Sequence, residues 1–218
     1  TDDGAFHLST NPWYDAFQVT VSNGTLNVEK ATSIAAQNIA INLANQPLGG
    51  FSVEVKGEPI TVASSVFIIA STTGSGYGLL TNVSLFDESG NVIAGPVDGV
   101  ISATTPITQQ TVTFTDTITY PVGKKVYSLK GKIPSTIGNG GTYIVSFTPS
   151  TAFTSVTGQT TGNSITASPA SSISLNTMTV KSSSLTITVS GNPIAQTVVA
   201  GGTIAFANYQ IDASASGE

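Results

Sequence analysis

The chain has 218 residues, of which 39% are hydrophobic and only 9% charged, with a net charge of −5. It carries seven lysines, no arginine and no cysteine, which argues against a basic nucleic-acid-binding face or a polybasic membrane-surface segment. The lack of cysteine also excludes disulfides, thiolate metal sites and cysteine nucleophiles. No apolar stretch reaches the length of about 18 residues that a membrane-spanning helix needs. Enough apolar residues remain for a core, and the abundance of Thr, Val, Ser and Gly favours an all-β protein.

The first quarter of the chain alternates between polar and apolar residues with period two. Residues 25–29 and 37–43 follow this alternation, which is typical of half-buried strands. Pro47 to Gly50 is predicted to form a turn before a strand at 51–55. The most apolar run, 60–69, is expected to be a strand at the centre of a sandwich.

The remaining elements also read as short strands separated by turns. Residues 80–86 and 91–94 flank a predicted hairpin turn at 87–90. Further strands are expected at 111–118, 125–132, 142–147 and 174–180, whereas 148–172 is rich in Thr, Ser and Gly with few large apolar residues. A helical turn is considered only within 31–40, and Pro193 in the matching second copy argues against it. About ten strands with regular turns indicate an all-β sandwich.

A long internal repeat organises the chain. Leu185, Ala195 and Gln196 each lie 159 residues after Leu26, Ala36 and Gln37, without a gap. The same offset aligns Val180 with Val21, Met178 with Val19 and Ile165 with Phe6. A recurrence this long indicates an array of similar domains. We therefore predict three parts: 1–23, the end of a preceding repeat or a donor-type strand; 24–181, a complete sandwich; and 182–218, the start of a second repeat or connecting strands.

Three segments carry a resemblance to a known type of module. They read LLTNVSLFDESGNVIAGPV, TVTFTDTITYPVGKKVYSLKGKI and GGTYIVSFTP, and LTITVSGNPIAQTVVAGGTIAFANYQIDASASGE looks like the start of the next module. The pattern resembles tandem modules of large bacterial surface proteins, including S-layer-like proteins of candidate-phyla bacteria. This resemblance implies an immunoglobulin-like β-sandwich in a structural or adhesive role, and it transfers no catalytic residue.

Candidate catalytic and metal-binding groups are sparse. His7 is the only histidine and has no evident nucleophile or carboxylate partner, so a surface histidine is the favoured interpretation. The acidic residues are spread almost singly, and the pairs Asp2-Asp3 and Asp87-Glu88 suit a terminus and a turn better than glycoside hydrolysis. Calcium is the more serious option, because Asp87, Asn91 and Asp98 could converge across the hairpin. We predict no cofactor, no metal and no catalytic site.

Aromatic residues and Asn triplets offer other candidate sites. The aromatic residues Trp13, Tyr14, Tyr77, Tyr127, Tyr143 and Tyr209 could form a sugar-stacking platform, although cross-strand packing is the commoner role. Trp13 and Tyr14 are predicted to contact a neighbouring subunit, together with Leu185, Ile187 and Val189 of the second copy. Asn23 and Asn82 head glycosylation-type triplets.

These observations predict a non-enzymatic structural subunit of an extracellular assembly, either a surface layer or a pilus-like fibre. Its partners would be further copies of itself, joined through edge strands, and residues 1–23 or 185–218 would lend a strand to the neighbour. An adhesin or carbohydrate-binding module is the alternative, with glycans as partners. An accessory β-domain of a secreted hydrolase is a third possibility.

Overall fold

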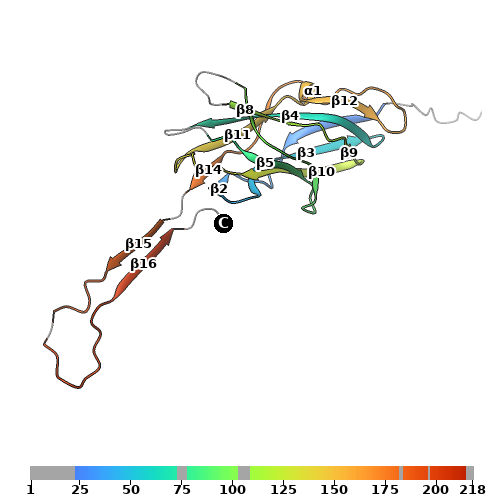
Figure 1. Cartoon of the computed structure of the whole chain (residues 1–218). Helices are drawn as coiled ribbons and strands as arrows, with labels where there is room; N and C mark the ends of the chain where they lie inside the picture. The colour runs from blue at the N-terminus through green and yellow to red at the C-terminus, as the bar shows by residue number, and fades with distance from the viewer. Residues whose placement is uncertain (1–22, 73–77, 103–108, 182–183, 196, 215–218) are drawn as a thin grey trace, which may run out of the picture.

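The computed structural model describes residues 23–72, 78–102, 109–181, 184–195 and 197–214. They form two sheets that pack face to face, with a separate two-stranded hairpin projecting from one end (Figure 1). The chain is therefore an all-β protein with an immunoglobulin-like β-sandwich, as the sequence predicted. None of the described helices is long and apolar enough to span a membrane.

The first sheet has five strands in the order β1-β3-β10-β5-β6. Their bounds are β1 (Thr25–Lys30), β3 (Gln46–Lys56), β10 (Gly123–Lys132), β5 (Thr81–Phe86) and β6 (Val92–Val97). Every pairing along this order is antiparallel, so each strand can bury one face while alternate side chains point to solvent.

The second sheet is built around β4 (Ile60–Thr72), as expected for the most apolar run. Its order is β2 (Gln37–Ala40), β14 (Met178–Lys181), β11 (Thr142–Phe147), β4, β8 (Gln109–Phe114) and β7 (Val100–Ile101). β9 (Ile118–Tyr120) and β12 (Phe153–Gly158) also pair with β4, and β13 (Ile173–Ser174) pairs with β11. One helical turn, α1 (Pro149–Ala152), precedes β12.

Aromatic rings join the two sheets at the centre of the core. Phe51 of β3 lies 5.4 Å from Phe147 of β11 and 5.7 Å from Phe67 of β4, measured between ring centroids. Phe67 and Phe147 meet edge to face at 4.8 Å, a favourable geometry for aromatic pairs. All three side chains are buried. Val112 and Phe114, at alternating positions of the strand expected at 111–118, are buried as well.

Two local predictions were wrong. Pro47 to Gly50 is not a turn but part of β3, where glycine is needed because Leu175 lies against Gly49 and Ile34 against Gly50. The strand at 37–43 ends at Ala40, since Asn42 has a φ of 60°, and Leu43 is 53% exposed instead of inward.

No helical turn forms within 31–40, the range where one was considered and argued against. Residues 31–36 are irregular and lead into β2, whereas the helical turn is α1, which begins at Pro149. The same Thr/Ser-rich region forms β12, with Phe153 and Val156 facing the core. Two apolar side chains among many hydroxyls were too weak a pattern to reveal this strand.

Candidate interaction surface

The hairpin of β15 (Ser184–Val189) and β16 (Tyr209–Ser214) has one apolar face and one polar face. Ile187 lies opposite Ile211 and Val189 opposite Tyr209. Because strand side chains alternate with period two, these four share one face, and the intervening pair of Thr188 and Gln210 belongs to the other.

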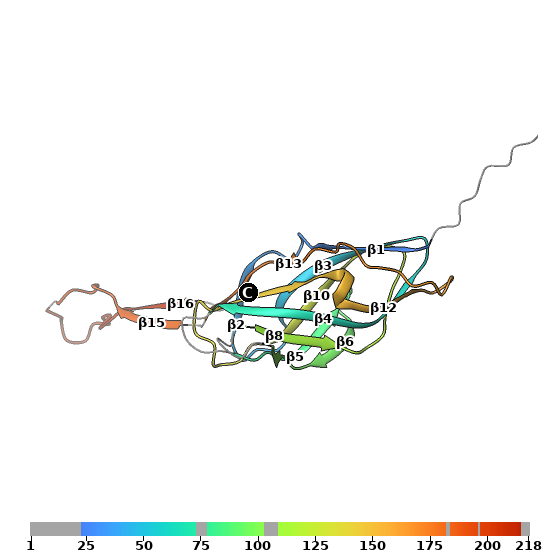
Figure 2. The same ribbon diagram turned by 90° about the horizontal axis from the view of Figure 1, so that it is seen from above.

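The apolar face is uncovered. Ile187 is 59% exposed, Val189 71%, and Tyr209 and Ile211 65% each. Both views show the hairpin extending away from the end of the sandwich (Figures 1 and 2). A two-stranded hairpin is marginally stable by itself, and large apolar side chains gathered on one exposed face mark a surface that binds something.

The hairpin reproduces the pairing of β1 with β3. In the sandwich, Leu26, Val28 and Lys30 lie opposite Val55, Val53 and Phe51, respectively. In the hairpin, Leu185, Ile187 and Val189 lie opposite Ala213, Ile211 and Tyr209. Ile187 follows Val28 by 187 − 28 = 159 residues, and Ile211 follows Val53 by 211 − 53 = 158. The ladder is thus the same, with one residue fewer in the connection.

The two copies differ in what covers them. Val28, Val53 and Phe51 are at most 1% exposed, because the second sheet packs over them. Their counterparts Ile187, Ile211 and Tyr209 carry similar apolar side chains without that cover. The hairpin therefore presents to solvent a face whose sequence is that of a sandwich core.

The residues predicted to form an interface fall into two groups. Leu185, Ile187 and Val189 all lie in β15, and the side chains of Ile187 and Val189 share the exposed apolar face. Trp13 and Tyr14 lie outside the described residues, as does His7. The sequence did not reveal the contribution of β16, since its partnership with β15 depends on a connection of nineteen residues, 190–208.

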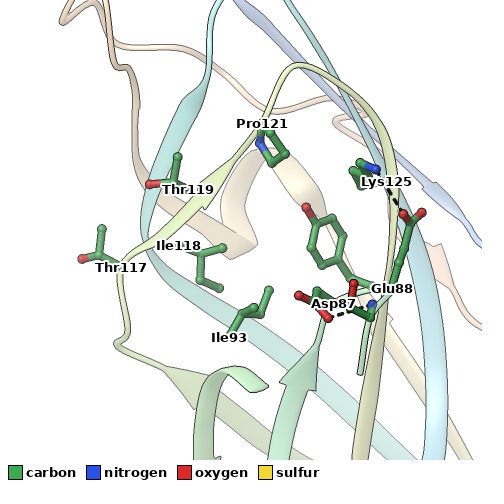
Figure 3. A pocket seen from close by; sticks show the side chains of 10 residues that line it. Asp87, Glu88, Ile93, Thr117, Ile118, Thr119, Pro121 and Lys125 are labelled. Carbon is green, nitrogen blue, oxygen red and sulfur yellow. Dashed lines mark hydrogen bonds and ion pairs between the residues drawn. The ribbon is translucent and has the colours of Figure 1, made fainter. Parts of the chain in front are cut away.

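A hollow of about 390 Å³ opens between the two sheets at the β5–β6 turn (Figure 3). Asp87, Glu88, Lys125 and Tyr127 line its polar side, and Ile93 and Ile118 its apolar side. The Glu88 carboxylate accepts a hydrogen bond from the Val126 N–H at 2.8 Å and lies 3.3 Å from Lys125 Nζ. These contacts, the backbone bond first, lower the pKa of Glu88. Burial, with the nearby carboxylates, raises the pKa of Tyr127 to about 12.

Of the three residues considered for calcium, Asp87 and Asn91 lie together, whereas Asp98 lies apart from them. Asp87 Oδ1 accepts the N–H groups of Ser89 and Asn91, and its Oδ2 accepts Asn91 Nδ2, which together lower the pKa of Asp87. Asp98 instead accepts the Asn82 N–H at 2.9 Å, at the opposite end of the β5–β6 hairpin. In the described part of the chain, no group of three or more acidic or histidine side chains could hold a metal.

The three aromatic candidates within the described residues, Tyr127, Tyr143 and Tyr209, do not form a platform. Tyr127 and Tyr143 are buried, and the Tyr143 hydroxyl donates to the Gly78 carbonyl at 3.0 Å. Tyr209 lies apart from them on the exposed face of β16. Tyr77, like Trp13 and Tyr14, lies outside the described residues.

Glu58 has a structural role that sequence reasoning missed. Its buried carboxylate accepts the N–H groups of Thr160 and Thr161 at 2.6 and 2.8 Å, and the Thr161 hydroxyl at 2.7 Å. The Thr161 hydroxyl is the largest of the causes that lower the pKa of Glu58. The carboxylate thus ties the loop after β12 to the turn before β4. No motif signalled this contact, because 102 positions separate Glu58 from Thr160.

Both asparagines of the glycosylation-type triplets are exposed. Asn23 Oδ1 accepts a hydrogen bond from Asn163 Nδ2 at 2.8 Å, and Asn82 lies near the start of β5 with a φ of 52°. Modification at either position stays a prediction.

Comparison with known proteins gives fold neighbours and no family. No family model and no curated protein matches the sequence. Among solved structures, a chain of the CaDoc0917–CaCohA2 complex has a TM-score of 0.31 at 13% identity, covering 72% of this chain and all 100% of its own. A type III cohesin module of the ScaE cell-surface anchoring scaffoldin of Ruminococcus flavefaciens has a TM-score of 0.23 at 14% identity, covering 73% and 88%. Self-complemented MyfA, the major subunit of Myf fimbriae from Yersinia enterocolitica, has a TM-score of 0.21 at 9% identity, covering 72% and 98%. At these TM-scores and identities, none of them indicates what this chain does.

Proposed function

We propose that this chain is a non-enzymatic structural subunit of an extracellular assembly, a surface layer or a pilus-like fibre, built from repeated β-sandwich modules. Residues 24–181 form one module, and 182–218 begin the next. The observation that carries the proposal is the β15–β16 hairpin, which repeats the β1–β3 ladder and leaves its apolar face exposed. In this proposal, the exposed face of the hairpin, at the boundary between two modules, binds the neighbouring molecule.

The physical reason is the cost of leaving the hairpin uncovered. Burying an Ile side chain stabilises by about 1.5–3 kcal/mol, so covering Ile187 and Ile211 gives a sizeable driving force for association. The outer edge of the hairpin also has backbone N–H and C=O groups that a further strand can pair with. The low charge of the chain, 9% of its residues, suits close packing between copies.

A glycan-binding adhesin is the alternative, and the hollow of Figure 3 is the observation that favours it. Its acidic groups and Lys125 could bind sugar hydroxyls. Against this, the Asp87 and Glu88 carboxylates already accept several hydrogen bonds from the turn and from β10.

Sedimentation velocity over a range of concentrations tests the structural proposal. The 218-residue chain is expected to self-associate, and the double substitution Ile187→Ser with Ile211→Ser is expected to shift it towards monomer. The control changes the opposite face, Thr188→Ser with Gln210→Ser, and should leave association as in the unaltered chain. A chain that stays monomeric at every concentration would overturn the proposal, and binding to a glycan panel by that monomer would favour the adhesin.

A further inference from the structure

The outer edge of β1 is covered in the sandwich by a segment from the end of the module. The Val28 N–H donates to the Ser168 carbonyl at 2.8 Å, and the Ser168 N–H donates to the Leu26 carbonyl at 2.9 Å. Asn27 and Ser168 thereby form a parallel bridge, which the Ser168 hydroxyl reinforces by donating to Asn27 Oδ1 at 2.9 Å. Beyond this bridge, β14 of the same terminal segment pairs in parallel with β2.

The equivalent edge of β15 has no such cover. β15 and β16 form a two-stranded sheet, so within the described residues only one edge of β15 is paired. Leu185 and Ile187 are the counterparts of Leu26 and Val28 in the repeated ladder. The backbone groups that receive Ser168 in the sandwich are therefore present on the hairpin without a partner strand.

The chain contains a second copy of the covering segment. The 159-residue offset aligns residues 1–22 with residues 160–181 and places Ser9 at the position of Ser168, since 168 − 9 = 159. Apolar character is kept at the flanking positions, where Phe6 and Leu8 stand for Ile165 and Ala167. In the sandwich, Ala167 is buried, and Ile165 packs against the core.

Geometry favours an intermolecular contact. β1 begins at the end of the sandwich opposite the hairpin (Figure 2), and residue 23 lies two positions before it. The fourteen residue steps from Ser9 to Asn23 can span at most about 46–50 Å. The thirteen-residue β4 alone is about 43 Å long. The segment from Ser9 to Asn23 would therefore have to be almost fully extended to reach β15 of the same molecule.

We propose that residues 1–22 of one copy bind the free edge of β15 in the next copy, with Ser9 opposite Thr186 as Ser168 is opposite Asn27. This inference rests on the proposed self-association and specifies which surfaces meet. We call the contact between residues 1–22 of one copy and β15 of the next the seam. Copies joined in this way repeat head to tail, because each has one terminal segment to give and one hairpin to receive it. The contact gives β15 the same kind of edge bridge that Ser168 makes with β1 in the sandwich.

Disulfide trapping tests the seam, because the chain has no cysteine of its own. Two single variants, Ser9→Cys and Thr186→Cys, are mixed and oxidised under mild conditions. The expected result is a disulfide-linked dimer that forms only when both variants are present. The double variant Asn27→Cys with Ser168→Cys calibrates the method, since its residues are partners within one sandwich and should form an intramolecular disulfide. Ser89→Cys, on an exposed turn, replaces Ser9→Cys as the matched control.

The outcomes separate the seam from the broader proposal. If the chain self-associates but the dimer of Ser9→Cys and Thr186→Cys is no more abundant than the control with Ser89→Cys, the assembly stands and this seam is wrong. A chain that shows neither self-association nor trapping contradicts both. A variant that carries both Ser9→Cys and Thr186→Cys and is trapped only as a monomer with an internal disulfide also overturns the intermolecular contact.

Discussion

Glu58 shows how a single buried acid can hold a Thr-rich loop in place. Its carboxylate accepts three hydrogen bonds from Thr160 and Thr161, and hydrogen bonds to an ionised group are among the stronger ones in proteins. They favour the charged form, so the pKa of Glu58 lies below its ordinary value of 4.5. A group with a lowered pKa in the folded state stabilises the fold above its ordinary pKa, and this contribution is lost as the pH falls below 4.5.

Glu58→Gln is therefore expected to lower the thermal unfolding temperature at pH 7. The difference from the unaltered chain should shrink as the pH falls through and below 4.5, because the carboxylate then loses its charge in both states. Unfolding followed by circular dichroism between pH 3 and pH 7 measures both effects. Glu54→Gln is the control, since Glu54 pairs with Lys56 at the surface and such pairs contribute little. An unchanged difference at pH 3 would contradict the role given to Glu58.

Two buried tyrosines differ in whether the side-chain hydroxyl has a hydrogen-bond partner. The hydroxyl of Tyr120 is buried without a hydrogen-bond partner among the described residues, and burial raises the pKa of Tyr120. The hydroxyl of Tyr143 donates to the Gly78 carbonyl at 3.0 Å. We expect Tyr120→Phe to leave stability unchanged or to increase it by up to about 1 kcal/mol, because an unpaired polar group is removed.

Tyr143→Phe is expected to lower the free energy of unfolding by about 1 kcal/mol or more, because it leaves the Gly78 carbonyl without that donor. Urea unfolding of both variants measures the difference. A larger loss for Tyr120→Phe than for Tyr143→Phe would show that the Tyr120 hydroxyl has a partner in solution.

At the scale of elements, the β5–β6 hairpin shows two different uses of glycine. Gly90 is in the turn with a φ of 83°, and a Cβ there would meet no atom within 4 Å. Gly95 has a φ of 90° and lies at a bulge, where the register shifts between Val83 and Leu85. A Cβ at Gly95 would lie 2.7 Å from the Val83 carbonyl oxygen and 2.9 Å from a Phe114 ring carbon. The second glycine is required by close packing as well as by conformation.

Substituting alanine separates these two requirements. Gly90→Ala is expected to cost about 1–2 kcal/mol from backbone strain alone. Gly95→Ala should cost about 1–3 kcal/mol more, because overpacking is added to the strain. Equilibrium unfolding of the two variants measures the difference, and equal losses would mean that β6 can move away from β5 without cost.

Strong local patterns made some elements predictable from sequence. The alternation in β1 and β11 and the apolar run of β4 were sufficient, because each buries a face with period two. β12 was missed because only Phe153 and Val156 of its six residues face inward, and Gly49 and Gly50 suggested a turn because nothing local signals Leu175 and Ile34 above them.

The candidate surface was predictable only in part. Ile187 and Val189 were identified through the repeat, whereas the whole apolar face depends on the pairing with β16 across a long connection. The hollow of Figure 3 was not foreseen, because its lining comes from the β5–β6 turn, β9 and β10, which are distant in sequence.

At the scale of the whole molecule, the connection between the sandwich and the β15–β16 hairpin is short. Two residues, 182 and 183, separate the end of β14 from the start of β15. Fully extended, the three residue steps from Lys181 to Ser184 span at most about 10–11 Å. In the assembly proposed above, successive modules would therefore be held close together along the chain.

The parallel pairing of β2 with β14 has a mechanical consequence. β1 begins at the end of the sandwich opposite the hairpin, and β14 ends next to the hairpin, so tension along a row of modules would pull β14 lengthwise past β2 (Figures 1 and 2). The register runs from Met178 opposite Gln37 to Lys181 opposite Ala40, and these pairs would resist sliding all at once. Pulled instead across the sheet, the same pairs would separate one after another at lower force. Stretching a single molecule by its two ends should accordingly require a higher force than peeling β14 away sideways.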